Sequence, residues 1–509
     1  MKGVVLVVCS LIVAMAYCNP VECPAKCECD IPRITCEGGT ISIPDKRLTA
    51  LVIQDADPPI TTLNHAITQQ LEHLVKLLLD SVGLTEIDPG ALATIQRLET
   101  LGITNNRIAT IGPATFRNCS KLIHLNLENN NIEVIEEGTF TSLDNLHHLK
   151  LSHNALTTLP KYLPTRLQVL DVEYNRISEV QDLSSASMTS LNLCHNDISH
   201  IDPDQIELKN LKSLCIGGIK FNLSDDLVNH NKFPVLESLQ LKGDPKNKLR
   251  VTNKIQENIL NMTTQSLKNL ELSYCGLASP KIFTQANSKL QNLKATDVKL
   301  VPTRLNLWPK FELPKIETLD LSRSRYLTKL FLTSNAPTTL PDLKILKMSY
   351  SWIRNFTESH FEQKTPNVKQ LDISHNLLDC TCYGISWIPN YERHGKLILL
   401  NEENTTCATP KHLKDIPLLT ASLCLIISTP DTTSTPATYT TSLVTSVDTT
   451  VIPEESHPSS PGMTTSTHLD LLITIVITIL VVIALIVIIM LVVFTVRHYK
   501  YKNRKFNVQ

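Results

Sequence analysis

Apolar residues recur in one fixed pattern along most of this 509-residue chain. In residues 122–132, LIHLNLENNNI, leucine or isoleucine stands at the first, fourth, sixth and eleventh positions, and Asn130 stands at the ninth. The same pattern begins 24 residues earlier at Leu98 and 24 residues later at Leu146. The alternation at its centre predicts a short strand whose leucines share one face. One unit cannot bury these leucines, but stacked units can, so the pattern predicts a solenoid with a parallel sheet.

About fourteen such units follow one another over residues 48–378, with a period of roughly 25 residues. The asparagine amide is expected to bond turn backbone that would otherwise be buried without a partner. From residue 211 onward the units keep the leucines but mostly lose the asparagine, and residues 242–266 are predicted to be an extended convex segment or a loop. The unit that begins at Val368 restores the pattern with Asn376.

This spacing resembles that of extracellular leucine-rich-repeat proteins. The resemblance implies an α/β solenoid, curved like a horseshoe, with parallel strands on its concave face and loops or short helices on its convex face. It also implies disulfide caps at both ends and one transmembrane helix.

The first 18 residues are typical of a secretory signal peptide. Lys2 supplies the positive start, residues 4–16 are mostly apolar, and residues 16–18 resemble a small-residue cleavage site. The apolar run is short for a membrane anchor. Its removal would leave twelve of the fourteen cysteines in an oxidising compartment, where disulfides are favoured over a zinc site.

Cysteines flank the repeats at both ends. The group in residues 19–47 has the spacing C-x3-C-x-C-x6-C and resembles the N-terminal cap of the family, which implies the pairs Cys23–Cys29 and Cys27–Cys36. The group in residues 379–425, with LDCTCYG and NTTCATP, resembles the C-terminal cap, especially that of Toll-like receptors, which implies Cys380–Cys407 and Cys382–Cys424. We expect Trp387 to cover the apolar end of the last repeat.

Four cysteines lie outside these caps. Cys275 occupies the asparagine position of its unit, where a buried thiol can substitute, and Cys119 lies in a convex segment. Cys194 and Cys215 fall on adjacent units near the concave strands. The spacing allows either a disulfide between them or two free thiols, because spacing alone does not fix connectivity. We favour two adjacent free thiols.

The composition changes after the second cap. Residues 426–468 are rich in Ser, Thr and Pro, which predicts an O-glycosylated stalk. Residues 469–496 contain 26 uncharged, almost wholly apolar residues from Leu471 to Val496, enough for a transmembrane helix. The basic tail, residues 497–509, predicts a type I protein in the plasma membrane with its N-terminus outside. The thirteen-residue tail has no room for a Toll-like signalling domain, which departs from that resemblance.

Charge and motifs exclude several functions. The net charge is −1, but the tail carries five basic residues and Lys2 a sixth, so the remaining chain carries −7. This acidic body argues against nucleic-acid binding. No metalloprotease, nucleophile-elbow, phosphate-loop or dinucleotide motif is present. We therefore expect no enzymatic activity and no cofactor.

In the regular half, the register places polar side chains on the concave face. Charges mixed with an aromatic ring suit a protein ligand, although any solvated solenoid face is polar. The histidines do not converge as a metal site requires. Binding that changes with histidine protonation, a pH switch, is a second hypothesis that the sequence allows. Our candidate ligand-binding residues are His124, Glu128, His148, Lys150, His153, Glu173, Tyr174 and His195.

Asn-x-Ser/Thr sequons suit a secreted ectodomain and predict glycosylation. The candidate sites are Asn118, Asn222, Asn261, Asn355 and Asn404.

The sequence thus predicts a cell-surface glycoprotein that binds a protein ligand by adhesion or ligand capture. The alternative is an innate-immune co-receptor for a Toll-like signalling chain or a microbial product. Its expected partners are an extracellular or cell-surface protein and, in an oligomer, a second copy or another receptor.

Overall fold

The computed structural model describes residues 27–30, 33–37, 48–284, 288–300, 311–333, 340–381 and 385–421. These residues all lie in the first of two units, Met1–Ser428 and Thr429–Gln509. The predicted signal peptide, stalk, transmembrane helix and tail lie outside the described residues. Within the described ranges no helix has the length and apolar character needed to cross a membrane.

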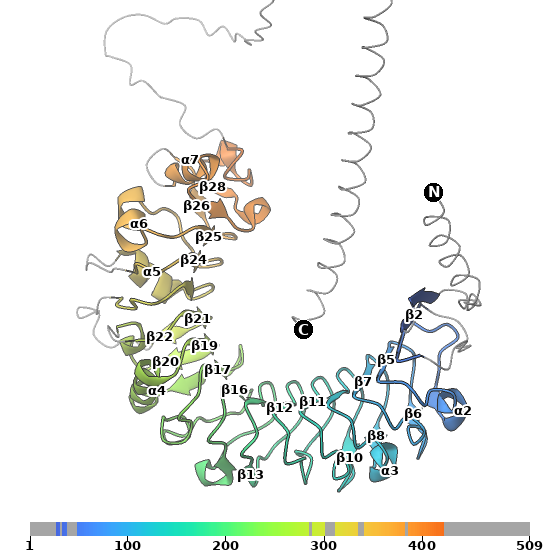
Figure 1. Ribbon diagram of the computed structural model, residues 1–509. Helices are drawn as coiled ribbons and strands as arrows, with labels where there is room; N and C mark the ends of the chain where they lie inside the picture. The colour runs from blue at the N-terminus through green and yellow to red at the C-terminus, as the bar shows by residue number, and fades with distance from the viewer. Residues whose placement is uncertain are drawn as a thin grey trace, which may run out of the picture. The chain divides into compact units, whose positions relative to one another are not determined.

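One sheet of 17 strands runs through this unit and lines the inner side of an arc (Figure 1). β1 and β2 pair antiparallel, and every later pair in the sheet is parallel. The strands in spatial order are β1 Cys27–Asp30, β2 Arg33–Glu37, β3 Ala50–Gln54, β5 Lys76–Asp80, β7 Thr100–Thr104, β9 His124–Asn126, β11 His148–Lys150, β12 Val169–Asp171, β14 Ser190–Asn192, β16 Ser213–Gly217, β17 Ser238–Lys242, β19 Asn269–Ser273, β21 Asn292–Thr296, β23 Thr318–Asp320, β24 Ile345–Lys347, β25 Gln370–Asp372 and β27 Ile398–Leu399.

Short strands and helices connect these strands outside the main sheet. The strands are β4 Thr62–Leu63, β6 Glu86–Ile87, β8 Thr110–Ile111, β10 Val134–Ile135, β13 Leu183–Ser184, β15 Ile206–Glu207, β18 Leu249–Val251, β20 Cys275–Leu277, β22 Lys299–Leu300, β26 Leu378–Asp379 and β28 Cys407–Thr409. The helices are α2 His65–Thr68, α3 Pro113–Phe116, α4 Asn253–Gln265, α5 Arg325–Thr333, α6 Glu358–Lys364 and α7 Trp387–Arg393, with 3₁₀ turns η1 Pro203–Gln205, η2 Lys281–Phe283, η3 Glu402–Asn404 and η4 Lys411–Leu413.

The apolar core follows the repeat pattern. Leu122, Leu125 and Leu127 are at most 1% exposed, as are their counterparts in neighbouring repeats. Each buried leucine stabilises the fold by about 1.5–3 kcal/mol before the entropy cost of ordering it. Phe116 and Phe140 fill the convex side with ring centroids 6.2 Å apart. The core is therefore one continuous layer between the sheet and the convex segments.

Residues 242–266, predicted as an extended convex segment or a loop, contain a helix of 13 residues. Thr252 caps the start of α4 by accepting a hydrogen bond from the Ile255 N–H. Ile255, Ile259 and Met262 lie on its buried face at the spacing of a helical turn. The longer repeat thus spans its convex side with a helix that packs on the core.

The asparagines behave as the pattern predicts. The Asn130 amide donates hydrogen bonds to the carbonyls of Ile103 (2.7 Å) and Leu127 (3.1 Å), and its oxygen accepts one from the Ile108 N–H (3.2 Å). Cys275 takes the same position in its unit, and its thiol contacts the Leu241 carbonyl at 3.4 Å. These contacts satisfy backbone groups of the preceding repeat and of the same repeat that would otherwise be buried unpaired.

Two of the four implied cap pairs lie within the described residues. The structure contains the disulfides Cys27–Cys36 and Cys380–Cys407. The other two implied pairs involve Cys23, Cys382 and Cys424, which lie outside the described residues.

Our preference for free thiols at Cys194 and Cys215 was wrong, because the two form a disulfide. Parallel pairing places Asn192 of β14 beside Cys215 of β16, so Cys194 lies diagonally across from Cys215. Their Cα atoms are 5.5 Å apart, within the usual range for a disulfide. Cys119 and Cys275 are free and buried.

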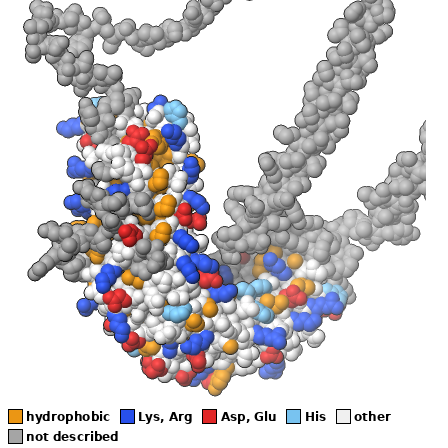
Figure 2. Space-filling view, turned by 60° about the vertical axis from the view of Figure 1, so that its left-hand side comes forward, with side chains coloured by type: hydrophobic (Ala, Val, Ile, Leu, Met, Phe, Trp, Pro, Cys, Tyr) orange, Lys and Arg blue, Asp and Glu red, His pale blue; other side chains and the backbone are white. Residues whose placement is uncertain are grey.

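Trp387 packs at the C-terminal end of the repeats as expected. Its ring lies against Phe361 (4.7 Å) and Phe356 (5.5 Å), and its indole N–H donates to the Phe356 carbonyl. On the face shown in Figure 2, acidic and basic side chains are interspersed over the surface, in keeping with 48 basic and 49 acidic residues in the chain. The fold therefore presents a mixed polar exterior over one apolar core.

Candidate ligand-binding face

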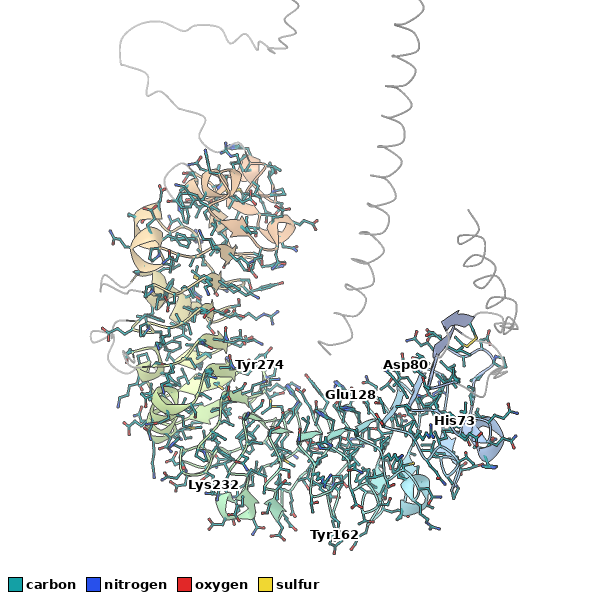
Figure 3. All side chains as sticks on the ribbon, viewed as in Figure 1. His73, Asp80, Glu128, Tyr162, Lys232 and Tyr274 are labelled. Atoms are coloured by element: carbon teal, nitrogen blue, oxygen red, sulfur yellow. A yellow bond between two sulfur atoms is a disulfide. The ribbon has the colours of Figure 1, made fainter. Side chains whose placement is uncertain are left out.

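Parallel register arranges the concave side chains in columns. His124 of β9 pairs with His148 of β11, and Asn126 pairs with Lys150. Because side chains alternate across a strand, these residues point away from the leucine core. Figure 3 shows Glu128 on the inner side of the arc and Tyr162 on the outer side.

His124 and His148 form the first group on this face. Their ring centroids are 4.5 Å apart with a tilt of 30°. Burial is the main cause that lowers the pKa of both histidines, and the nearby His147 lowers it further. Both rings are therefore held in the neutral form at neutral pH, and acid would place two positive charges side by side.

Glu128 organises the second group. Its carboxylate accepts hydrogen bonds from the Ser152 hydroxyl (2.6 Å) and the Asn126 amide (2.8 Å), and it lies 3.6 Å from the Lys150 ammonium. Three partners from two adjacent repeats hold this carboxylate in one position. Such fixed charges lose little entropy when a ligand binds.

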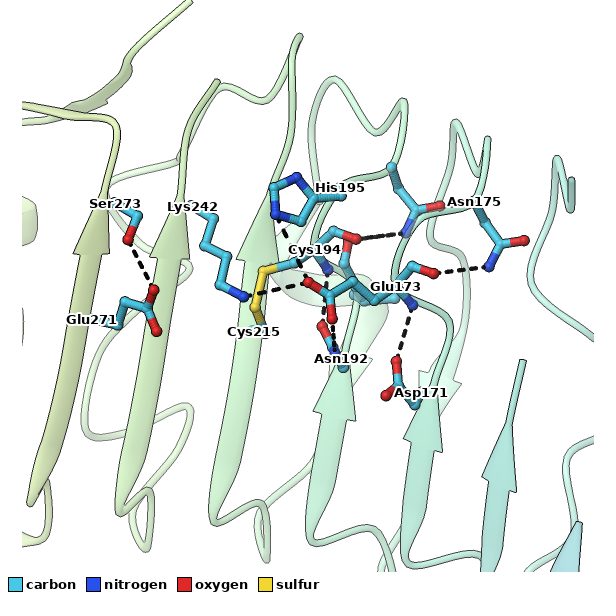
Figure 4. Close-up of polar contacts among 12 residues, drawn as sticks. Asp171, Glu173, Asn175, Asn192, Cys194, His195, Cys215, Lys242, Glu271 and Ser273 are labelled. Carbon is cyan, nitrogen blue, oxygen red and sulfur yellow. Dashed lines mark hydrogen bonds and ion pairs between the residues drawn. A yellow bond between two sulfur atoms is a disulfide. The ribbon is translucent and has the colours of Figure 1, made fainter. Parts of the chain in front are cut away.

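Glu173 is the centre of the third group (Figure 4). Its carboxylate contacts the Lys242 ammonium at 3.3 Å, the Asn192 amide at 3.0 Å and the His195 ring nitrogen at 3.8 Å. The Glu173 and Lys242 side chains are each only 20% exposed, so this ion pair is screened less than a surface pair. Burial lowers the pKa of His195, and the Glu173 carboxylate opposes part of that effect.

Lys242 reaches Glu173 because the residues between them are small. Lys242 pairs with Gly217 of β16, and the next repeat carries the bridged Cys194. A Cβ atom on Gly217 would lie 1.8 Å from the Lys242 carbonyl oxygen, so only glycine fits there. Figure 4 shows the lysine extending past the disulfide toward Glu173.

Rings stack along the edge of the sheet, three residues beyond the end of each strand. His153, Tyr174 and His195 all have left-handed backbone, with φ between 53° and 56°. The Tyr174 ring lies 4.5 Å from His153 and 4.3 Å from His195, nearly parallel to both. Tyr174 remains 46% exposed. The three repeats therefore present the edges of a rigid ring stack to solvent.

All eight candidate residues thus lie on four consecutive repeats, from β9 to β14. They form three adjacent groups and the ring stack and do not converge on one point, which suits an extended surface better than a small-molecule pocket. Within the described ranges no cluster of three or more His, Cys, Asp or Glu side chains could hold a metal ion.

Sequence reasoning missed Lys242 and the Cys194–Cys215 disulfide. The available signal was a run of small residues at equivalent positions, Cys194 and Gly217, ahead of a lysine in the next repeat.

Comparisons with known proteins agree with this architecture. A family model described as "Leucine rich repeat" matches residues 72–132 and 96–156. Toll-like receptor 2 of Ovis aries is 24% identical over 237 residues, which cover 43% of this chain and 29% of that receptor. CD180 antigen of Homo sapiens is 29% identical over 223 residues, which cover 43% of this chain and 28% of that protein.

Among solved structures, a chain of the TLR13–ssRNA13 complex was compared with this one. The aligned region covers 77% of this chain and 66% of the chain in the complex, with 20% sequence identity and a TM-score of 0.42. The match to the family model shows leucine-rich repeats in residues 72–156, and part of the chain is similar to Toll-like receptor 2 and CD180. The matched segment spans less than a third of the length of either relative.

Proposed function

We propose that this chain is a non-enzymatic cell-surface glycoprotein that binds a protein ligand through the concave face from β9 to β17. The observation that carries the proposal is the Glu173 network beside the exposed ring stack. Tyrosine, histidine and fixed ion pairs together offer apolar contact and directional hydrogen bonds, as protein interfaces do.

The predicted glycosylation pattern supports this location. All five sequon asparagines are exposed, and none lies in a strand of the main sheet: Asn118, Asn222, Asn261, Asn355 and Asn404. Glycans at these positions would leave the concave strands uncovered. A bulky glycan on the strands themselves would block a protein ligand, so their lack of sequons is compatible with docking there.

Membrane anchorage is part of the proposal. The signal peptide at residues 1–18, the stalk at 426–468, the transmembrane helix at 469–496 and the tail at 497–509 would make a type I protein with its repeats outside the cell. The cysteine groups at residues 19–47 and 379–425 would close both ends of the apolar core, including the pairs Cys23–Cys29 and Cys382–Cys424.

The sequence similarity to Toll-like receptor 2 and CD180 favours a second candidate function. In that arrangement the chain is an innate-immune co-receptor that presents a ligand to a separate signalling chain.

Mixing cells that express the full-length chain with cells that do not would test the adhesion proposal. Clustering of expressing cells with each other indicates homophilic binding, and clustering with the other cells indicates a heterophilic ligand. Tyr174→Asn should abolish clustering, because asparagine keeps the left-handed backbone and removes the ring. Tyr162→Asn is the matched control, since Tyr162 has a φ of 54° and is 65% exposed on the convex side.

Clustering that survives Tyr174→Asn contradicts the concave face as the binding site. Absence of any clustering contradicts adhesion and leaves the co-receptor role.

A further inference from the structure

A second exposed surface lies on the repeats of β23, β24 and β25, away from the candidate ligand-binding face. Arg323, Tyr350 and His375 occupy the same left-handed position as Tyr174, with φ between 53° and 60°. The Arg323 guanidinium lies 4.8 Å from the Tyr350 ring centroid, and the Tyr350 and His375 rings are 4.2 Å apart. Three repeats therefore contribute one continuous row of side chains.

A second row runs beside the first, two residues further along each repeat. The Arg325 guanidinium lies 4.8 Å from the Trp352 ring centroid. The Asn376 side chain accepts hydrogen bonds from the backbone N–H groups of Ser351 and Ile353, which holds the segment around Trp352 against the segment around Leu377. Together the two rows form the Arg–aromatic patch: Arg323, Arg325, Tyr350, Trp352, His375 and Leu377.

Three large apolar or aromatic side chains of the patch are exposed. Trp352 is 61% exposed, Tyr350 45% and Leu377 41%. Exposed apolar side chains in one place mark interaction sites, and tryptophan, tyrosine and arginine are the residues most enriched at binding hot spots.

The guanidinium groups of the two arginines lie over aromatic rings, and within the described ranges neither group donates a hydrogen bond to another residue. Among the residues the structure describes, no carboxylate forms an ion pair with Arg323 or Arg325; Asp297 acts on Arg323 only at longer range. A stacked guanidinium keeps its planar fork of N–H donors free for a bidentate carboxylate.

We propose that the Arg–aromatic patch binds an acidic segment of a partner protein, with carboxylates on the two arginines and apolar side chains on Trp352 and Leu377. This interface is separate from the concave face and independent of the function proposed for it.

Charge argues against a second copy as the occupant. A two-fold contact through this patch would bring arginines of one copy near those of the other, and like charges across an interface are costly. A sulfated glycan would match the arginines but would leave the exposed tryptophan and leucine without apolar contact. An acidic polypeptide uses both halves of the patch.

The test pans a random peptide-display library on the purified full-length chain in detergent. Enriched peptides should combine Glu or Asp with large apolar residues. Binding of an enriched peptide, measured by fluorescence anisotropy, should weaken at least about tenfold in Arg323→Asn/Arg325→Gln and in Trp352→Ala, as loss of a hot spot predicts. Arg250→Gln is the matched control, because Arg250 is exposed in β18 and has no ring beneath it.

Several outcomes would overturn the proposal. Enriched peptides without acidic residues would do so, as would unchanged affinity in the arginine variant. Binding of heparin oligosaccharides that Trp352→Ala leaves intact would favour a glycan instead. Sedimentation showing a dimer that Trp352→Ala dissociates would favour a second copy. Thermal unfolding of each variant at the same temperature as the unsubstituted chain excludes misfolding as the cause of weaker binding.

Discussion

The Cys194–Cys215 disulfide gives the sharpest prediction from the fold. Replacing Cys194, Cys215 or both by alanine removes a cross-link between residues 21 positions apart. The loop-entropy relation gives a stabilisation of about 3 kcal/mol for a loop of this length. The disulfide lies in the sheet where the Glu173 network is built, so its loss should loosen that network first.

Urea denaturation of the full-length chain, followed by tryptophan fluorescence, measures the free energy of unfolding. Either single variant already breaks the cross-link. The free energy of unfolding should therefore fall by the same amount, about 3 kcal/mol, in Cys194→Ala, in Cys215→Ala and in the double variant. Small losses that add in the double variant would show that the two thiols are not bonded. Labelling of the unreduced, denatured chain gives an independent check, since Cys119 and Cys275 should react and Cys194 and Cys215 should not.

Three further predictions concern single side chains. Asn130→Ala leaves a buried N–H and two buried carbonyls without a partner, so it should lower the free energy of unfolding in urea by about 3 kcal/mol. Asn130→Cys should lower it less, because the Cys275 thiol already occupies this position in another repeat. The pKa values of His124 and His148 are lowered in the fold from 6.5, so the unfolded chain binds more protons below that pH. The free energy of unfolding should therefore fall as the pH drops below about 6.5, and a pH series on His124→Gln/His148→Gln should show a flatter curve. Glu173→Gln should lower the pKa of His195 still further, because it removes the carboxylate that opposes the effect of burial. An NMR titration of the imidazole measures this pKa, and a value that rises or stays constant would contradict the network.

The regular half of the solenoid could be predicted because its register repeats. Once Leu122 and Asn130 fix one unit, the next unit repeats each position, and parallel pairing then places His124 beside His148. The same logic placed Glu128 and Tyr174 on the concave face; in the structure Glu128 is half-buried there, and Tyr174 lies beyond the end of β12 at the edge of the sheet. These placements follow from side-chain alternation along a strand and need no knowledge of distant contacts.

The side-chain contacts between non-equivalent or non-adjacent positions of different repeats could not be predicted from the repeat pattern. The bond from Cys194 to Cys215 runs diagonally between columns, and the reach of Lys242 to Glu173 depends on the absence of a side chain at Gly217. Neither relation is encoded in the order of apolar and polar residues. Both depend on the lateral distance between strands, which only the folded sheet defines.

The Arg–aromatic patch was missed for a different reason. Two of its three repeats have lost the asparagine that marks the turn, with Ser324 and Ser351 in its place, so the exposed register beyond their strands could not be assigned. The Ser351 hydroxyl still donates to the Leu321 carbonyl at 3.3 Å, which preserves the turn without its usual residue. Without that marker, nothing in the sequence indicated that Tyr350 and Trp352 lie outward.

The asparagine contacts also determine how this molecule can change over generations. Each amide bonds backbone of the unit before it: the Asn106 amide reaches the Leu79 carbonyl, 27 residues away, and the Asn130 amide reaches the Ile103 carbonyl, also 27 residues away. A gene duplication or loss that adds or removes one whole unit reproduces this joint at the new boundary. A shorter insertion keeps the columns only on the convex side, as in the repeat that carries α4, because one within a strand would turn its side chains to the opposite face. Descendants of this chain can therefore vary the length of their inner surface in whole units while the chemistry of each unit evolves separately.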